Sequence, residues 1–258
     1  MENTIGLEAE YFLRDRDGKL LIPFEHNFSF DEYILLGEFR AEKGNTRAKC
    51  LANFLESFYE TKYEIEDRNM VMDFADGWTT LTPEFYAELL RKMGNKEISR
   101  SENINDIDLL KLTDAIVKNG EIKEIKASVG LHIHFGSADI VERSQKQESF
   151  QKVNLPIGTN SDSMFHFQFY EKVGEETHTI KATANRITKP VVNYIVREFD
   201  EKILPSYVED LPKLKYRNPG FYEIKPWGFE YRSLPFNKLV LDNIAEIVDF
   251  AFQKLEEL

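Results

Sequence analysis

The sequence contains little cysteine, little histidine and no long apolar run. Its 258 residues include one cysteine, Cys50, and five histidines. One cysteine cannot form an internal disulfide, so we expect an intracellular, reducing setting, with the cytoplasm as the location. No apolar stretch reaches the length of about 18 residues that a transmembrane helix needs. The first residues lack the basic and then apolar pattern of a secretory signal, so we expect neither a membrane association nor a leader.

Positive charge is also scarce. The chain has 33 Lys and Arg against 45 Asp and Glu, which gives a formal net charge of −12. General nucleic-acid binding needs clustered Lys and Arg, so we do not expect it here. The apolar content of 42% can fill a core, and no repeat, low-complexity tract or Pro/Gly/Ser linker divides the sequence. We therefore predict a single domain over residues 1–258.

Strand and helix patterns alternate without regular βαβ units. The patterns predict strands over 4–13, 34–42, 121–136, 164–172, 177–184, 220–225 and 228–234. They predict helices over 46–62, 82–93, 105–118, 188–203 and 237–257. The strands at 164–172 and 177–184 are expected to form a hairpin. This mixture indicates an α+β fold with a largely antiparallel sheet.

Four of the predicted strands share one chemical pattern. Side chains at i and i+2 of a strand point to the same face, so each of these strands has ionisable groups on one face and apolar groups on the other. The ionisable groups, in chain order, are Glu8 and Glu10, then Glu38, Arg40 and Glu42, then His132 and His134, then Glu230 and Arg232. On three strands a glycine lies two residues before the first of these groups, which leaves room for a bulky ligand over the sheet.

Each pattern alone is typical of an ordinary surface. A Glu-x-Glu strand is usually solvated, a His-x-His pair is more often structural than metal-bound, and a Glu-x-Arg pair is often a surface ion pair of little energetic value. Unpaired carboxylates on neighbouring strands repel one another unless divalent cations lie among them. If the four strands are neighbours, the combination therefore predicts a metal-binding face.

Together the four motifs resemble the carboxylate–amine ligases of the glutamine synthetase and glutamate–cysteine ligase superfamily, in particular the phage-type amidoligases. The motifs are Gly6–Glu10 (GLEAE), Glu38–Glu42 (EFRAE), Gly130–Gly136 (GLHIHFG) and Gly228–Pro235 (GFEYRSLP). The resemblance covers about residues 4–62, 120–137 and 186–250, and ends over about 140–185, where the chain has an inserted aromatic hairpin. It implies a curved, mostly antiparallel sheet with helices on its outer face, as in a glutamine synthetase-like catalytic domain.

The resemblance also implies an activity, which is the joining of a carboxylate to an amine while ATP becomes ADP and phosphate. The concave face of the sheet is expected to bind ATP with Mg²⁺ or Mn²⁺. An acyl phosphate gives the carboxylate a good leaving group, and its formation needs positioned cations more than covalent help from the protein. The substrates are expected to be small-molecule or peptide carboxylates and amines.

Individual roles follow from the same resemblance. The expected metal ligands are Glu8, Glu10, Glu38, His132 and Glu230. Arg232 is expected to contact the terminal phosphate of ATP, and Arg40 to contact phosphate or a substrate carboxylate. His134 is expected to support the bound cofactor from beside the metal ligands, and Glu42 has the weakest case because it lies at a strand end.

Residues near the last motif keep two interpretations. Arg217, Tyr222 and Lys225 line the nucleotide or substrate pocket, or they are surface residues at a strand end. Trp227 stacks on adenine, or it packs beside a turn. The sequence contains neither a G-x-x-x-x-G-K-[ST] nor a G-x-G-x-x-G phosphate loop. If ATP binds, metals on the sheet must therefore hold it.

Two other functions compete with the ligase. A metal-dependent hydrolase would use His132, His134 and the carboxylates to activate water, and it would need no nucleotide. A non-catalytic binding protein on the same scaffold is the third hypothesis. Its hallmark would be the loss of a motif residue, and every residue of the core set is present in the sequence.

Overall fold

The computed structural model describes residues 3–30, 35–93, 113–118, 121–137, 140, 169–173, 176–180, 189–208, 219–225 and 227–258. The described chain is α+β, and its strands pair antiparallel, as the sequence predicts. The main sheet consists of β1 (Thr4–Asp15), β2 (Leu20–Leu21), β3 (Gly37–Arg40), β4 (Met70–Asp73), β8 (Gly130–Gly136), β11 (Tyr222–Lys225) and β12 (Gly228–Pro235).

Two smaller sheets accompany the main one. The first has the order β5 (Trp78–Leu81), β7 (Glu121–Ser128), β6 (Thr113–Lys118). The second is the hairpin of β9 (Phe169–Val173) and β10 (Glu176–Ile180). This hairpin confirms the prediction of paired strands within 140–185, although residues 141–168, 174–175 and 181–185 of that segment lie outside the described residues.

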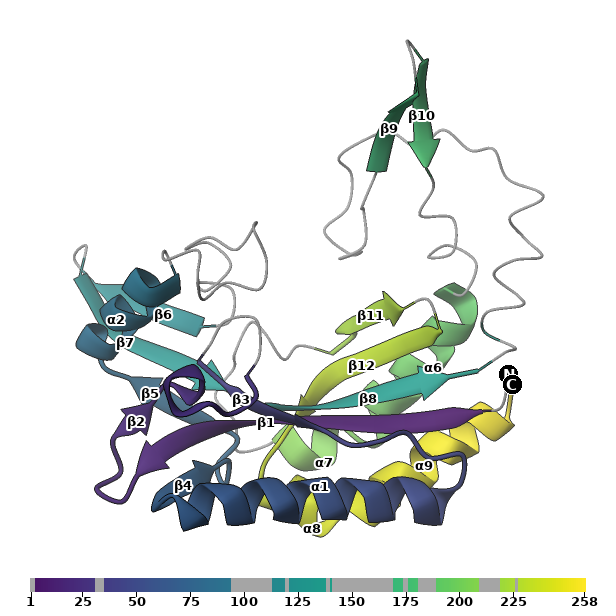
Figure 1. Ribbon diagram of the computed structural model, residues 1–258. Helices are drawn as coiled ribbons and strands as arrows, with labels where there is room; N and C mark the ends of the chain where they lie inside the picture. Colours follow the sequence, from purple (N-terminus) through teal and green to yellow (C-terminus); the bar gives the residue numbers. More distant parts are fainter. Residues whose placement is uncertain are drawn as a thin grey trace.

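Strand β1 is the centre of the main sheet (Figure 1). Its first half pairs with β8 on one edge, and β3 pairs with it on the other edge. Because β8 also pairs with β12, the four strands that carry the shared pattern are neighbours in the order β3-β1-β8-β12. The condition that the sequence pattern depended on is therefore met.

The alternation along these strands divides the sheet into two faces. The apolar face carries residues such as Leu7, Ile133 and Tyr231, which are at most 2% exposed. Helices α1 (Arg47–Asp67), α8 (Lys238–Asp242) and α9 (Ile244–Glu256) run beneath this face in Figure 1. Helices α6 (Lys189–Lys202) and α7 (Pro205–Val208) contact β12, and α2 (Pro83–Met93) contacts β7.

Aromatic side chains fill the space between the sheet and the helices. Phe236 stacks on Phe74 with ring centroids 4.6 Å apart, and Phe39, Phe54 and Phe58 surround the pair. Offset and edge contacts of this kind add to the free energy that burial alone provides. The helices are thereby fixed beneath β1 and β3, and the opposite face of these strands is the polar one.

The predicted helix ends are partly confirmed. Thr46 caps α1 by accepting the Lys49 N–H, and Thr82 accepts the Phe85 N–H at the start of α2. Helix α1 continues to Asp67, five residues beyond the predicted end at 62. The predicted helix over 237–257 is interrupted at Asn243, which separates α8 from α9.

The helix predicted over 105–118 is wrong where it can be compared. Residues 113–118 form β6, which pairs with β7, and residues 105–112 lie outside the described part. Thr113, Ile116 and Val117 are β-branched, and the following Asn119-Gly120 pair is a signal for a hairpin turn between strands as well as for a helix end. The sequence-based prediction takes the pair as a helix end, whereas Lys118 and Glu121 on either side of it are paired as in a hairpin.

The strand predicted over 121–136 is divided at Val129. Its two halves are β7 and β8, which belong to different sheets. The backbone of Val129 is bonded outside both strands, because its N–H donates to Gly77 and its carbonyl accepts from Phe236. Strands β4 and β5 were not predicted.

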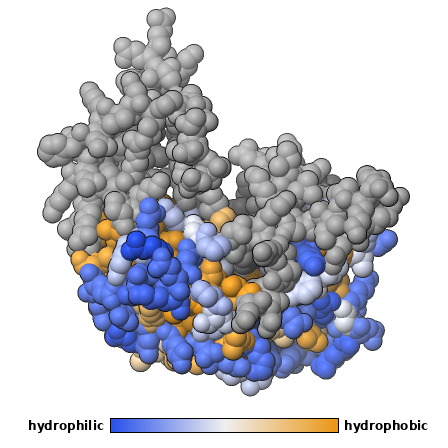
Figure 2. Space-filling model, turned by 180° about the vertical axis from the view of Figure 1, so that it is seen from behind, coloured by the Kyte–Doolittle hydropathy of each residue, from blue (hydrophilic) through white to orange (hydrophobic). Residues whose placement is uncertain are grey.

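The surface of the described residues is largely hydrophilic on the side seen from behind, with smaller apolar areas between (Figure 2). Among the described helices, none has both the length and the apolar character that a membrane span requires.

Candidate functional site

The polar face of β3, β1, β8 and β12 carries an unusual concentration of buried ionisable groups. Glu8, Glu10, Glu38 and Glu230 are 2–4% exposed, and His132 is fully buried. Carboxylates are rarely buried to this extent unless they are paired or bind a metal ion. Together with His134, these residues are called the carboxylate–imidazole cluster below.

Strand register explains why the cluster forms. Glu8 of β1 lies opposite His132 of β8 and opposite Arg40 of β3, and Glu10 lies opposite Glu38. On the far side of β8, Glu230 lies opposite His134. Residues directly opposite one another in an antiparallel pair have their side chains on the same face, within reach of each other.

His132 is at the centre of the cluster. Its Nδ1 lies 3.0 Å from Glu8 Oε1 and 3.1 Å from Glu230 Oε1, and its Nε2 lies 3.5 Å from Glu10 Oε1. Burial acts to lower the pKa of His132, but the charge of Glu10 and the bonds to Glu230 and Glu8 outweigh it and raise the pKa to about 9. The imidazole is therefore protonated at neutral pH, and it neutralises part of the carboxylate charge.

Arginine and lysine neutralise the two ends of the cluster. Arg40 Nε lies 2.6 Å from Glu8 Oε2 and 2.8 Å from Glu38 Oε1. At the other end, Arg232 Nε lies 3.0 Å from Glu230 Oε1, and Lys225 Nζ lies 3.1 Å from Glu230 Oε2. The site thus has cations beside its carboxylates, as recognition of an anionic ligand requires.

The carboxyl groups do not share one charge state. Burial alone would raise the pKa of Glu8, but bonds from His132 and His134 and the charge of Arg40 hold it well below its ordinary range. The bond to His132 and the charge of Arg232 likewise outweigh burial and lower the pKa of Glu230. For Glu38, burial and the charge of Glu8 raise the pKa to about 8 despite Arg40. The neighbouring cations therefore do not keep every carboxyl group of the cluster ionised, and Glu38 is the one whose pKa is raised.

Three residues of the cluster converge as a metal site would. Ligand atoms of Glu8, His134 and Glu230 all lie within 4.8 Å of one another. Carboxylate oxygens suit Mg²⁺, and a carboxylate and imidazole set suits Mn²⁺. The residues present therefore fit a divalent cation. Glu10 is positioned differently, because its Oε2 accepts the Gly130 N–H at 2.7 Å.

The two histidines are arranged differently from the sequence-based expectation. That expectation made His132 a metal ligand and gave His134 a supporting position. In the described residues the converging imidazole is that of His134, which is 21% exposed on its side chain and lies 3.5 Å from Glu8 Oε2. His132 lies behind it, fully buried and bonded to carboxylates.

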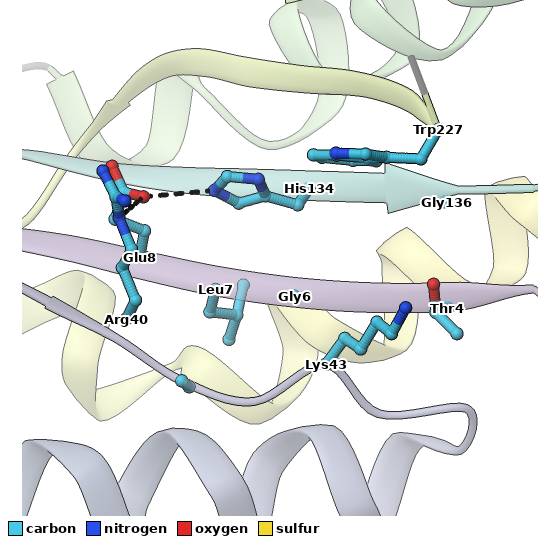
Figure 3. A pocket seen from close by; sticks show the side chains of 10 residues that line it. Thr4, Gly6, Leu7, Glu8, Arg40, Lys43, His134, Gly136 and Trp227 are labelled. Carbon is cyan, nitrogen blue, oxygen red and sulfur yellow. Dashed lines mark ion pairs between the residues drawn. The ribbon is translucent and has the colours of Figure 1, made fainter. Parts of the chain in front are cut away.

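A cavity of about 490 Å³ opens beside this group and is called the Trp227 cavity below. Figure 3 shows the Trp227 ring over the His134 ring, with centroids 5.4 Å apart and planes 28° apart. Lys43 and Arg40 line the opposite side, and Gly6 between them has no side chain to fill the space. The cavity thus joins a flat aromatic wall, two cations and two residues of the converging group, Glu8 and His134.

A second cavity, of about 390 Å³, lies at the β3 edge and is called the Tyr11 cavity below. It is lined in part by Tyr11, Glu38, Glu60 and Glu64, and by Arg40. Arg40 also lines the Trp227 cavity. Arg40, which pairs with carboxylates of the cluster, is therefore common to the linings of both cavities.

The remaining predicted residues lie at varying distances from the site. Arg217 is outside the described residues. The Tyr222 hydroxyl donates to Asn193 Oδ1 at 3.0 Å, which supports the interpretation of Tyr222 as a surface residue at a strand end. Glu42 lies beyond the end of β3 and is exposed.

The sequence interpretation did not select Glu223 or Lys43. Glu223 lies opposite Glu230 and contacts Lys225 Nζ at 2.9 Å. Its i, i+2 spacing to Lys225 repeats the pattern of the four motif strands, and this signal could have found it. Lys43 lies after β3 ends, where no strand alternation marks it.

No family model, no curated protein and no solved structure matches the chain.

Proposed function

We propose that the chain is an ATP-dependent carboxylate–amine ligase that forms an amide or peptide bond through an acyl phosphate, on a glutamine synthetase-like catalytic domain. One observation carries the proposal, which is the in-register alignment of four motifs on the polar face of β3-β1-β8-β12. This alignment gathers buried carboxylates, imidazoles and guanidiniums, the groups that metal-assisted phosphoryl transfer needs.

Glu8, His134 and Glu230 would hold the divalent cation, Mg²⁺ or Mn²⁺, and Glu10, Glu38 and His132 adjoin them. When bound, the cation would supply positive charge to the phosphate oxygens. Arg40 and Arg232 now pair with carboxylates of the cluster. With their carboxylate partners engaged by a bound cation, the Arg40 and Arg232 guanidiniums would be able to bind phosphate oxygens. The Arg40 side chain is 64% exposed, so it has room for this movement.

The Trp227 cavity is the proposed place for the nucleotide. Its aromatic wall can stack on a base, and Lys43 and Arg40 can bind the phosphates. Lys225 lies beside Glu230 on the same face and is a further cation for the cofactor. This arrangement needs no phosphate loop, because the sheet supplies both metal ligands and cations.

The chemistry joins the two cavities. An oxygen of the substrate carboxylate attacks the terminal phosphorus of ATP, and ADP leaves with the electrons of the broken P–O bond. The amine nitrogen then attacks the acyl carbon, and the C–O bond to phosphate breaks as the C–N bond forms. Phosphate leaves with that electron pair, and the nitrogen gives up its proton. Arg40, which lines both cavities, would stabilise the charge that develops on the transferred group.

Hydroxylamine can replace the unknown amine in a test of this proposal. The protein is incubated with ATP, Mg²⁺, hydroxylamine and each member of a panel of amino acids, dicarboxylic acids and short peptides. The proposal predicts hydroxamate and ADP in equal amounts, only when the acid and ATP are both present. Glu230→Gln should abolish both products, whereas the matched variant Glu42→Gln, outside the cluster, should retain them. Absence of ATP binding with Mg²⁺ and with Mn²⁺, measured by titration calorimetry, would contradict the proposal.

A metal-dependent hydrolase is the second candidate. The observation in its favour is that Glu8 and His134, of the converging group, line an open cavity where a metal-bound water could meet a substrate. Ester or amide hydrolysis with Mn²⁺ and without ATP would support the hydrolase and contradict the ligase. ATP binding without any turnover would instead indicate a non-catalytic binding protein.

A further inference from the structure

The Tyr11 cavity has a chemistry unlike that of the Trp227 cavity. It lies between β3, helix α1 and the segment that follows η1 (Pro23–His26), and it has a volume of about 390 Å³. Three of its lining residues are glutamates, and Arg40 at its inner end is already paired with Glu8 and Glu38. The cavity therefore presents acidic groups to a ligand.

Glu60 and Glu64 form the outer acidic side of this cavity. They are four residues apart on α1, so they lie one above the other on one face of the helix. Glu64 Oε1 pairs with Arg68 at 2.5 Å. No ion pair to Glu60 occurs among the described residues. One carboxylate in the lining is thus available to a cation.

Tyr11 gives an independent indication of a ligand. Its side chain is 0% exposed and lines the cavity. Within the described part of the chain its hydroxyl oxygen has no hydrogen-bond partner. A buried polar group without a partner is rare and costly, and a phenolic oxygen can accept an N–H bond. A ligand with an N–H donor would satisfy it.

The lining favours an organic cation over a metal ion. Among the described residues, carboxylate and imidazole ligands converge tightly at Glu8, His134 and Glu230, whereas the glutamates of the Tyr11 cavity are not part of such a group. Aromatic rings of Phe28 and Phe39 contribute to the walls. Phe28 already has the Arg68 guanidinium 4.7 Å from its ring centroid, so this wall is compatible with a cation.

We propose that the Tyr11 cavity binds an organic ammonium group, held by Glu60 and by the Tyr11 hydroxyl oxygen. If the proposed ligase function holds, this group belongs to the amine substrate, which reaches the acyl phosphate past Arg40. The binding site itself does not depend on ATP.

The test is a titration with n-butylammonium chloride, observed at Tyr11. The protein is labelled with 3-fluorotyrosine, and the Tyr11 resonance is assigned from its loss in Tyr11→Phe. n-Butylammonium should shift this resonance until the site is saturated, while 1-butanol and an equal concentration of sodium chloride should not. Glu60→Gln should raise the half-saturation concentration by up to about fivefold, as loss of one exposed ion pair does. Glu56→Gln, one turn earlier on the same helix and outside the lining, should leave it unchanged.

Three results would overturn the proposal. They are no saturable shift of the Tyr11 resonance, an equal response to 1-butanol, or equal effects of Glu60→Gln and Glu56→Gln. The titration contains no nucleotide, so its outcome is separate from that of the hydroxamate assay. Hydroxamate formation without ammonium binding at Tyr11 would leave the ligase and reject this cavity as the amine site. Ammonium binding without hydroxamate formation would leave the Tyr11 cavity as an ammonium site and reject the ligase function.

Discussion

Glu8 and Glu38 lie on either side of the Arg40 guanidinium, yet they differ in charge. The pKa of Glu8 is held well below its ordinary range, whereas burial and the charge of Glu8 raise the pKa of Glu38 to about 8. Without a metal, Glu8 is therefore ionised at neutral pH and Glu38 is mostly protonated. We predict that substitution by glutamine destabilises the protein at position 8 and is tolerated at position 38.

The magnitudes follow from the contacts. Glu8→Gln removes the buried carboxylate that pairs with both His132 and Arg40, although His132 keeps Glu230 and Arg40 keeps Glu38. Removing one partner of a buried ion pair costs about 3–5 kcal/mol. Glu38→Gln replaces a protonated carboxyl with a neutral group of similar shape, so its cost at pH 6 should stay below about 1 kcal/mol.

The effect of Glu38 should depend on pH with a defined sign. Above its ordinary pKa, Glu38 is ionised in the unfolded chain but remains protonated in the folded protein until the pH approaches 8. The folded state then binds the extra proton, so rising pH favours the unfolded state of the wild type, by about 1.4 kcal/mol per pH unit. Between pH 6 and pH 9 the wild type should lose about 3 kcal/mol relative to Glu38→Gln.

Urea unfolding in EDTA at pH 6 and pH 9 measures these differences, with Glu42→Gln as the matched control on the exposed side of the same segment. Equal destabilisation by Glu8→Gln and Glu38→Gln at pH 6 would refute the assigned charge states. So would a stability difference between wild type and Glu38→Gln that is the same at both pH values.

Three further substitutions test the framework of the site. Gly228→Ala would place a Cβ 1.8 Å from the Phe135 carbonyl oxygen, and we expect loss of soluble protein or more than about 3 kcal/mol of stability; a wild-type urea midpoint would contradict this. Phe236→Ala should cost about 3–5 kcal/mol in urea unfolding, because its fully buried ring contacts four others; a loss below about 1 kcal/mol would show that the cluster repacks. Tyr11→Phe should stabilise the protein by about 1 kcal/mol and so raise its thermal midpoint slightly, because it removes a hydroxyl without a partner among the described residues. A lower midpoint would reveal a bond to that hydroxyl.

The sequence predicted the chemistry of each strand face but depended on an assumption about their arrangement. Alternation alone placed Glu8 and Glu10 opposite Leu7 and Ala9, because side-chain direction in a strand is a local property. The contact between Glu8 and His132 joins residues 124 positions apart. No local pattern determines that β1 lies between β3 and β8, so the adjacency of the motifs could only be assumed.

Other features were beyond the sequence patterns for physical reasons. His132 and His134 share a face, and their difference arises because His132 lies beneath three carboxylates while His134 lies under Trp227 at the cavity. The lining of the Tyr11 cavity comes mainly from β1, β3 and α1, which are separate in the sequence. The alternation along β1 assigns Tyr11 to the apolar face, so the pattern gave no sign that its hydroxyl would line a cavity. Strand β6 was misassigned because an Asn-Gly pair is compatible with both a helix end and a hairpin turn.

The central claim is that the polar face binds a divalent cation beneath a nucleotide. The most direct measurement is a crystal structure with Mn²⁺ and a non-hydrolysable ATP analogue, with the metal located from its anomalous signal. We predict a manganese peak among Glu8, His134 and Glu230, with the phosphates facing Arg40 and the base against Trp227. A nucleotide bound away from this face, or a cluster without manganese at saturating concentrations of both ligands, would contradict the claim.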